Sequence, residues 1–280
     1  MAGTAITAGE RHVSVDGLRL RVRVQGHGPP LLLVMGLGGN LEMWGPLVDE
    51  LAGFTTIAFD APGTGDSEIP WRPLRMHELA DTTAHLLDAL GCPNADVIGV
   101  SFGGAVAQEL VHRHPDRVRR LVLAATTCGF GGIPGKPSAL ALLSTPYRYY
   151  SRSHMRAIAA RLYGGEIARR PELLERHAYE MLAHAPSARG YLWQMSAIVG
   201  WSSLLYLHRI RQPVLVMTGD DDPIIRVVNG RILALLIPNA RLHVLGGGGH
   251  LFLIDQPKES AELIRRFLVG AEQGADGRPA

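Results

Sequence analysis

Short runs of apolar residues alternate with longer amphipathic segments along most of this 280-residue chain. The apolar runs are continuous, as expected of strands that are buried on both faces of a sheet. They fall at Leu31–Val34, Phe54–Asp60, Asp96–Val100, Arg120–Ala125, Pro213–Thr218 and Ala240–Leu245. Helical periodicity falls between them, at Leu41–Leu51, Met76–Leu90, Phe102–Arg113, Ile225–Leu236 and Lys258–Leu268. This alternation predicts an α/β fold with a mainly parallel, doubly wound sheet.

Two regions depart from the alternation. Near the start, Asp16-Gly17 separates two strand-like runs and predicts a β-hairpin that adds an antiparallel edge to the sheet. From about Gly131 to Arg209 the chain is rich in helix formers, aromatic residues and arginines, and it has no strand-like run. We interpret this region as a helical cap inserted over the sheet rather than a separate domain. The predicted organisation is a core at 1–130, a cap at 131–209 and a second core segment at 210–280.

Composition narrows the classes of function. A hydrophobic content of 46% and a charged content of 19% are typical of a soluble globular protein, and a net charge of +2 gives no strong attraction for nucleic acid. The scattered arginines, Arg21 among them, are expected to lie on a solvated surface. No apolar run is long enough to span a membrane, and residues 1–10 lack the features of a secretory signal. We therefore expect a cytoplasmic protein in which Cys92 and Cys128 are buried thiols.

The candidate chemistry starts at the pentapeptide Gly99-Val100-Ser101-Phe102-Gly103, which joins a predicted strand directly to a predicted helix. A serine on such a sharp turn has a strained backbone and presents its hydroxyl beyond the end of the sheet. Side chains at positions 99 and 103 would collide with the neighbouring helix and strand, which explains the glycines. Ser101 is therefore a candidate nucleophile.

A serine nucleophile needs a histidine base and a carboxylate that orients it, and these follow in that architecture on loops after later strands. The last predicted strand runs into four glycines and His250, which is the candidate base. The strand before it ends in Asp220-Asp221-Asp222-Pro223. We select Asp222 as the acid because it lies furthest along the loop. Asp220 and Asp221 are interpreted as turn formers or caps of the following helix.

Acyl transfer also needs two backbone N–H donors for the oxyanion. The amide of Phe102, directly after the serine, and that of Leu37, in the glycine-rich loop 35–40, are the candidates. A phosphate-binding loop is the alternative for 35–40, but the lysine and Ser/Thr of a P-loop are missing. No histidine pair has metal-ligand spacing, so we expect neither a metal nor a cofactor. The glycine-rich turn Asp60–Ser67 is expected to be structural scaffolding.

These motifs, in this order, resemble the α/β-hydrolase fold over essentially the whole chain. More closely, the sequence resembles the intracellular depolymerases of medium-chain-length poly(3-hydroxyalkanoates). The matching segments are Gly36–Glu42, Ile57–Gly63, Val122–Thr126, Pro134–Pro137, Leu162–Gly165, Gly190–Gln194, Arg211–Pro213, Gly219–Pro223 and His250–Ile254. Matches inside the predicted cap carry the most weight, because caps vary widely among hydrolases with different substrates.

The resemblance implies a serine esterase that cleaves this hydrophobic polyester or its oligomers and that associates with storage granules. Aromatic residues of the cap suit such a substrate, although they also suit packing within the cap itself. We expect Met35, Trp193, Trp201 and Tyr150 to contact the substrate. A carboxylesterase or carbon–carbon bond hydrolase acting on small soluble substrates is the rival enzyme, and a catalytically idle granule-binding protein is the rival of another class. The sequence makes no prediction of oligomeric state.

Overall fold

The computed structural model describes residues 6–270, in which eight strands form one sheet in the order β1-β2-β4-β3-β5-β6-β7-β8. The strands are β1 (Gly9–Val15), β2 (Leu18–Gly26), β3 (Pro30–Val34), β4 (Thr55–Phe59), β5 (Ala95–Val100), β6 (Val118–Ala124), β7 (Val214–Gly219) and β8 (Ala240–Leu245). β1 and β2 pair antiparallel with each other, β2 pairs antiparallel with β4, and the remaining pairs are parallel. The prediction of a mainly parallel sheet with an antiparallel edge is confirmed.

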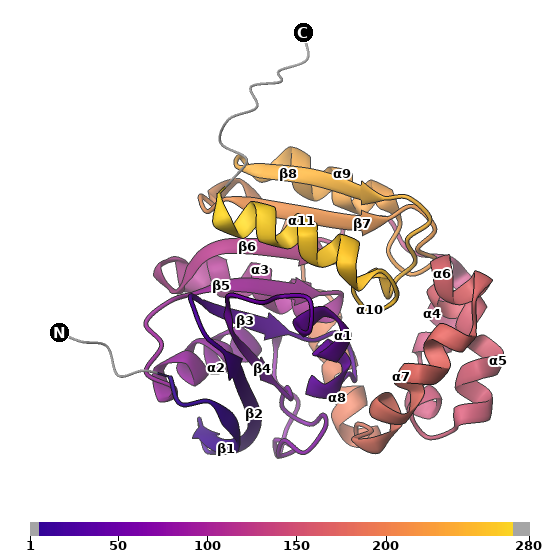
Figure 1. Cartoon of the computed structure of the whole chain (residues 1–280), viewed down its shortest axis with the longest axis horizontal. Coiled ribbons are helices and arrows are strands. Elements are labelled where there is room, and N and C mark those ends of the chain that lie inside the picture. Colours follow the sequence, from indigo (N-terminus) through magenta and orange to yellow (C-terminus); the bar gives the residue numbers. More distant parts are fainter. Residues whose placement is uncertain (1–5, 271–280) are drawn as a thin grey trace, which may run out of the picture.

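Helices cover both faces of the sheet (Figure 1). One face carries α1 (Gly45–Val48), α10 (Phe252–Asp255) and α11 (Pro257–Val269), and the other carries α2 (Met76–Ala89), α3 (Phe102–Arg113) and α9 (Val227–Leu236). β3 shows why its apolar run is continuous. Leu31 and Leu33 pack in the first core, whereas Leu32 and Val34 pack in the second. Because successive strand residues point to opposite faces, a strand between two helical layers needs apolar residues at every position.

The hairpin turn forms as the sequence predicts. Asp16 and Gly17 have φ values of 49° and 77°, which are the two positive values that a type I′ turn requires. The predicted helix at Leu41–Leu51 is different, because it is split into the short 3-10 helix η1 (Leu41–Trp44) and α1. Pro46 lies at the start of α1, where its missing N–H is tolerated, but it cannot continue a helix that began earlier.

Between β6 and β7 the chain forms helices without a named strand, apart from an isolated bridge between Gly129 and Ser202. The helices are α4 (Pro137–Leu143), η3 (Pro146–Tyr149), α5 (Arg152–Tyr163), α6 (Gly165–Arg169), α7 (Glu172–Ala183), α8 (Ala188–Ile198) and η4 (Leu207–Arg209). In Figure 1, α4 to α7 lie beyond the carboxyl ends of the parallel strands. We refer to residues 131–209 as the cap. Two predictions reach beyond the described residues. The second core segment, predicted at 210–280, does so at 271–280, and the prediction that residues 1–10 lack a secretory signal does so at 1–5.

Arg21 corrects the expectation of solvated arginines. On β2 its side chain is almost completely buried and forms ion pairs with Glu10 at 2.7 Å and Glu42 at 2.6 Å. Asp60 lies 3.4 Å from the same guanidinium and accepts a hydrogen bond from the Leu41 amide at 2.8 Å. Burial raises the pKa of Asp60 to about 6. This network ties the hairpin to η1 and to the turn at 60–67.

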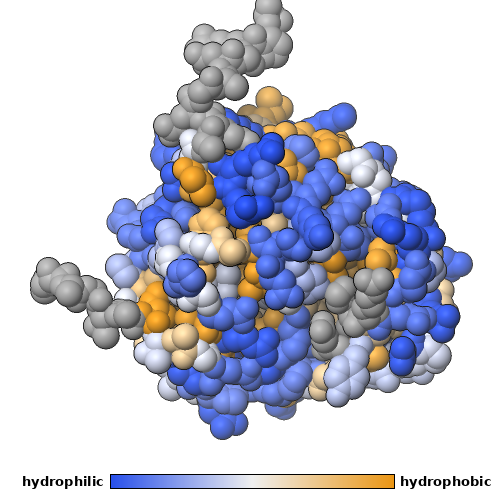
Figure 2. Space-filling view, viewed as in Figure 1, coloured by the Kyte–Doolittle hydropathy of each residue, from blue (hydrophilic) through white to orange (hydrophobic). Residues whose placement is uncertain are grey.

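The face seen in Figure 2 is covered mainly by hydrophilic residues, with apolar side chains in smaller patches. In the part of the chain that the structure describes, no helix combines the length and the apolar character needed to cross a membrane. Cys92 and Cys128 are both buried and unpaired, as expected.

Candidate active site

Ser101 occupies a one-residue turn between the end of β5 and the start of α3. Its φ of 54° is one of three positive values at non-glycine residues in the described part of the chain. The turn is held on both sides: the Ser101 amide donates to the Ala124 carbonyl at 2.9 Å, and the Thr126 hydroxyl donates to the Ser101 carbonyl at 2.7 Å. An unfavourable backbone that the surroundings fix in this way is typical of a functional residue.

The flanking glycines have the steric role that the sequence predicts. A Cβ at Gly103 would lie 2.0 Å from the carbonyl oxygen of Val34 on β3. A Cβ at Gly99 would lie 2.5 Å from the carbonyl oxygen of Gly103 and 2.7 Å from the Ala107 side chain on α3. Both distances are far below van der Waals contact, so the close approach of β5, α3 and β3 requires glycine at each position.

His250 is brought to the serine turn by the glycine loop after β8. Its Nε2 lies 3.0 Å from Ser101 Oγ, and its Nδ1 lies 2.8 Å from Asp222 Oδ2. An ionised carboxylate can only accept, so the proton belongs on Nδ1, which leaves Nε2 to accept from the serine hydroxyl. The imidazole and the Asp222 carboxylate are almost completely buried. This arrangement can remove the proton from Ser101 as the hydroxyl attacks.

The three consecutive aspartates have three different partners. Asp222 uses its second oxygen, Oδ1, to accept from the amides of Ile224 and Ile225 at 2.8 and 2.9 Å, which fixes the carboxylate toward His250. Asp220 accepts from the Gly247 amide at 2.7 Å, and Asp221 accepts from the Gly165 amide at 3.0 Å. Asp220 and Asp221 lie in a turn, which was one of the two predicted roles, but neither caps the following helix, whose N-cap is Arg226. Asp220 binds the glycine loop 246–250 that carries His250, which we call the histidine loop, and Asp221 binds the cap.

The two predicted oxyanion donors lie beside the serine. Phe102 is the first residue of α3, and a Cβ on Gly36, the residue before Leu37, would lie 3.3 Å from the Ser101 Cβ. Neither the Leu37 amide nor the Phe102 amide donates a hydrogen bond to another residue of the described chain. Two unused N–H groups next to a serine are what a developing oxyanion requires.

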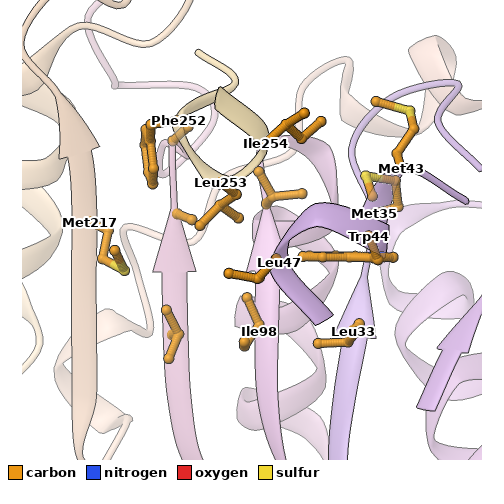
Figure 3. Close-up of a cluster of buried hydrophobic side chains, with 14 of the residues drawn as sticks. Leu33, Met35, Met43, Trp44, Leu47, Ile98, Met217, Phe252, Leu253 and Ile254 are labelled. Carbon is orange, nitrogen blue, oxygen red and sulfur yellow. The ribbon is translucent and has the colours of Figure 1, made fainter. Parts of the chain in front are cut away.

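A cavity of about 450 Å³ lies beside Ser101 and His250, and its wall is mainly apolar. Core and cap both contribute to this wall, with Met35, Leu37, Met43, Trp44, Leu47, Leu140, Leu143, Tyr149, Met195, Ile198, Ile224, Ile225, Leu251, Leu253 and Ile254. Figure 3 shows how Met35, Met43, Trp44, Leu253 and Ile254 gather above the carboxyl ends of the strands. Such a cavity suits a substrate with aliphatic groups next to the reacting carbonyl.

Of the four predicted substrate-contacting residues, only Met35 lines this cavity. Trp201 packs on Gly129 and donates its indole N–H to Glu109 at 2.9 Å. Tyr150 is half exposed and donates to the Pro186 carbonyl at 2.6 Å, while Trp193 carries the Arg189 guanidinium on its ring. Each of these three aromatic side chains has a partner elsewhere, which corrects the prediction.

The cavity wall also contains residues that the sequence did not predict to contact substrate. Leu251, Leu253 and Ile254 directly follow His250, so their position after the base was a usable signal. Trp44 and Met43 come from η1, whose apolar pattern indicated only a core helix. Arg148 was not selected, although it lies among three tyrosines, Tyr147, Tyr149 and Tyr150, which was a usable signal that it is buried against aromatic rings. Within residues 6–270 no cluster of three His, Cys, Asp or Glu residues could hold a metal ion.

The site is a serine hydrolase arrangement on an α/β scaffold. Ser101 lies on its strand-to-helix turn, His250 and Asp222 follow it, and all three lie at the carboxyl edge of the parallel sheet. Comparison with known proteins agrees, because a family model described as the alpha/beta hydrolase fold matches residues 29–257. The chain belongs to the alpha/beta hydrolase family, and it is a hydrolase.

Individual relatives confirm the resemblance predicted from the motifs. The chain is 44% identical to the poly(3-hydroxyalkanoate) depolymerase of Ectopseudomonas oleovorans, over 96% of this chain and 95% of that enzyme, and is a homologue of it. The crystal structure of the enol-lactonase from Burkholderia xenovorans superimposes with a TM-score of 0.80 at 25% identity, over 92% of this chain and all of that one. A meta-cleavage product hydrolase from Pseudomonas fluorescens has a TM-score of 0.81 at 23% identity, over 94% and 98%, and shares the fold.

Proposed function

We propose that this hydrolase is a serine esterase that cleaves the ester bonds of medium-chain-length poly(3-hydroxyalkanoate) or its oligomers. The observation that carries the proposal is the relay of Ser101, His250 and Asp222, with distances of 3.0 and 2.8 Å, beside an apolar cavity of about 450 Å³. The homologue from E. oleovorans, named as a poly(3-hydroxyalkanoate) depolymerase, supports the choice of a polyester substrate.

In the proposed mechanism Ser101 Oγ attacks the ester carbonyl carbon while its proton passes to His250 Nε2. The amides of Leu37 and Phe102 stabilise the oxyanion, and Asp222 stabilises the imidazolium. As the ester C–O bond breaks, His250 gives the proton to the departing alkoxide oxygen of the next hydroxyacyl unit, which leaves as a hydroxyl. Water then attacks the acyl carbon of the acyl-enzyme, with His250 again as base. As the bond from this carbon to Ser101 Oγ breaks, His250 returns the proton to Oγ and the 3-hydroxyacyl group leaves as an acid.

We also propose that residues 131–209 act as a cap over this site and that the partner is a hydrophobic polyester surface, such as a storage granule. Cap residues form part of the cavity wall, including Leu140, Leu143, Tyr149 and Met195. The side chains of Phe130 and Leu205, on segments next to cavity-lining residues, are about four-fifths exposed. Exposed apolar side chains near a site are typical of a protein that works on an apolar partner.

The test is hydrolysis of amorphous medium-chain polyester granules, measured beside soluble short-chain and medium-chain acyl esters. We expect the wild type to release hydroxy acids from the granules and Ser101→Ala to lose activity on all substrates by about 10⁴–10⁶-fold. Activity on soluble esters alone would leave a carboxylesterase and overturn the polymer assignment. Binding to granules without any hydrolysis would indicate a catalytically idle binding protein. Unchanged activity of Ser101→Ala would overturn the serine mechanism itself.

A further inference from the structure

The peptide bond between Leu37 and Gly38 is held on both of its edges by side chains of the cap. The Tyr149 hydroxyl donates to the Leu37 carbonyl oxygen at 2.8 Å. On the opposite edge, the Gly38 amide donates to Gln194 Oε1 at 2.9 Å. The N–H of Leu37, the proposed oxyanion donor, belongs to the preceding peptide and shares the Leu37 Cα with the held one. Fixing one peptide plane therefore restricts the direction of the other.

Arg148 adds a charge at the same place. Its side chain is almost completely buried, its Nη1 donates to the Tyr191 hydroxyl at 2.7 Å, and its Nη2 lies 3.4 Å from the Leu37 carbonyl oxygen. The guanidinium carbon also lies 4.5 Å from the centre of the Tyr149 ring and 5.1 Å from that of the Tyr191 ring. Burial raises the pKa of Tyr191 to about 12, so this hydroxyl stays protonated and donates in turn to the Leu143 carbonyl.

No carboxylate of the described residues pairs with the Arg148 guanidinium, although it lines the cavity that contains Ser101. A buried cation without an anion has a desolvation cost that a purely structural residue would avoid. Both Nη atoms already donate to groups of the protein, to the carbonyls of Thr145 and Leu37 and to two tyrosine hydroxyls, which holds the guanidinium in place. Its charge is free to act on an anion that develops in the cavity.

We propose that Arg148, Tyr149 and Gln194 of the cap are positioning residues for the oxyanion hole. They fix the Leu37 amide before the reaction starts, and the unpaired charge of Arg148 stabilises the oxyanion beside it. Gly38 allows the close seating of the loop, since a Cβ there would lie 2.7 Å from the Tyr191 ring and 2.8 Å from the Tyr149 ring. This assignment rests on the proposed function. The proposal makes the position of the glycine-rich loop 35–40, the oxyanion loop that carries the Leu37 amide, dependent on the cap.

The experiment compares Tyr149→Phe, Gln194→Met and Arg148→Met with the wild type. Tyr149→Phe and Gln194→Met keep the size of the side chain and remove its hydrogen bond to the loop. Arg148→Met removes the charge together with the hydrogen bonds of the guanidinium. We expect kcat on p-nitrophenyl octanoate to fall about 10–100-fold with KM changed less than about threefold, because the contacts matter most in the transition state. Affinity for an alkyl trifluoromethyl ketone, which forms a tetrahedral oxyanion adduct with serine, is expected to fall in proportion to kcat/KM.

Tyr150→Phe is the matched control, since this neighbouring tyrosine donates to the Pro186 carbonyl and not to the loop. It is expected to keep wild-type kcat and ketone affinity. Arg148→Lys is expected to recover part of the kcat lost in Arg148→Met, because it restores the charge. If Arg148→Met does not fold, as judged by circular dichroism, Tyr149→Phe and Gln194→Met carry the test.

Two negative outcomes are distinguishable. If the wild type turns over no ester, or Ser101→Ala is fully active, the proposed function fails. If the wild type is active and depends on Ser101, but Tyr149→Phe and Gln194→Met keep its kcat and ketone affinity, the positioning role is overturned and the proposed function stands. A loss that appears only in KM, or only in thermal stability, also overturns the positioning role.

Discussion

The backbone amide of His250 donates a 2.7 Å hydrogen bond to the carbonyl oxygen of Tyr163, so the cap holds the histidine loop directly. The two segments pack without side chains between them. A Cβ on Gly249 would lie 2.4 Å from the Tyr163 carbonyl oxygen, and one on Gly165 would lie 2.1 Å from the Gly249 nitrogen. Together with the contacts of Tyr149 and Gln194 on the oxyanion loop, this bond makes the cap part of the support for the reacting groups.

Gly165→Ala is expected to displace the histidine loop. The new methyl group would collide with the Gly249 backbone, and the φ of 56° adds strain. We expect kcat on a soluble ester to fall by at least about tenfold, because a small misplacement of a reacting group has a large effect on rate. Gly200→Ala is the matched control: its φ is 74°, but no atom lies within 4 Å of the added Cβ. Equal activity of the two variants would contradict this account of the loop.

Substitution of the three aspartates separates the acid from its neighbours. Asp222→Asn is expected to lower kcat by about 10⁴-fold, because an amide in place of the carboxylate favours the wrong histidine tautomer. Asp220→Asn and Asp221→Asn are expected to stay within about tenfold of wild type, since an amide oxygen can still accept from Gly247 and Gly165. Steady-state kinetics on one soluble ester checks all three. A loss in Asp221→Asn as deep as in Asp222→Asn would argue against Asp222 as the acid.

The sequence predicted the reacting groups because each has a local signal. Ser101 lies between glycines at a strand-to-helix junction, and both Asp222 and His250 follow an apolar strand in the order that the architecture requires. Since parallel strands end at the same edge of a sheet, position along the chain translates into position in space. The strands and most helices of the core were predictable for the same reason. The exception, η1 and α1, is broken by a proline within the apolar pattern.

The cavity wall could not be predicted in the same way, because it depends on how the cap helices fold over the sheet. Aromatic character alone was a poor guide: Trp201 is bound to Glu109, and Tyr150 is bound to Pro186. Arg148 shows the opposite case, since an arginine is normally solvated. Its burial arises from the packing of Tyr149 and Tyr191 around it, of which only Tyr149 is its neighbour in the sequence.

Asp255 is expected to make stability depend on pH. Burial, with the nearby charge of Glu166, raises the pKa of Asp255 to about 6, and the opposing effect of the Ile167 amide is smaller. The unfolded chain loses this proton near pH 4. Between pH 4 and 6 the folded state therefore holds a proton that the unfolded state has lost. As pH rises through this range, the contribution of Asp255 to the free energy of unfolding falls, by at most about 3 kcal/mol.

The corresponding variant is Asp255→Asn, which is neutral at every pH. We expect it to be about 1–3 kcal/mol more stable than wild type at pH 7, with little difference at pH 4. Urea denaturation at the two pH values measures this. A variant that is less stable than wild type at pH 7, or a difference that does not change with pH, would contradict the role of the buried carboxylate.

Phe130 and Leu205 lie on two segments of chain that are bonded to each other. The Phe130 amide donates to the Trp201 carbonyl at 2.8 Å, and the Ser202 hydroxyl donates to the Phe130 carbonyl at 2.7 Å. Gly129 and Ile198, at the base of these segments, line the cavity. This proximity of the exposed Phe130 and Leu205 side chains to cavity-lining residues supports the proposed contact with an apolar polymer surface.

The double substitution Phe130→Ser and Leu205→Ser is expected to slow hydrolysis of amorphous polyester granules about tenfold. A large apolar side chain contributes about 1.5–3 kcal/mol when fully buried, so partial burial of two such side chains accounts for a change of this size. Hydrolysis of a soluble octanoate ester is expected to stay within about twofold, because neither side chain touches a reacting group. Leu235→Ser, at an equally exposed leucine on α9, is the control and is expected to affect neither substrate. Equal losses on granules and soluble ester would contradict a role in contacting the polymer surface.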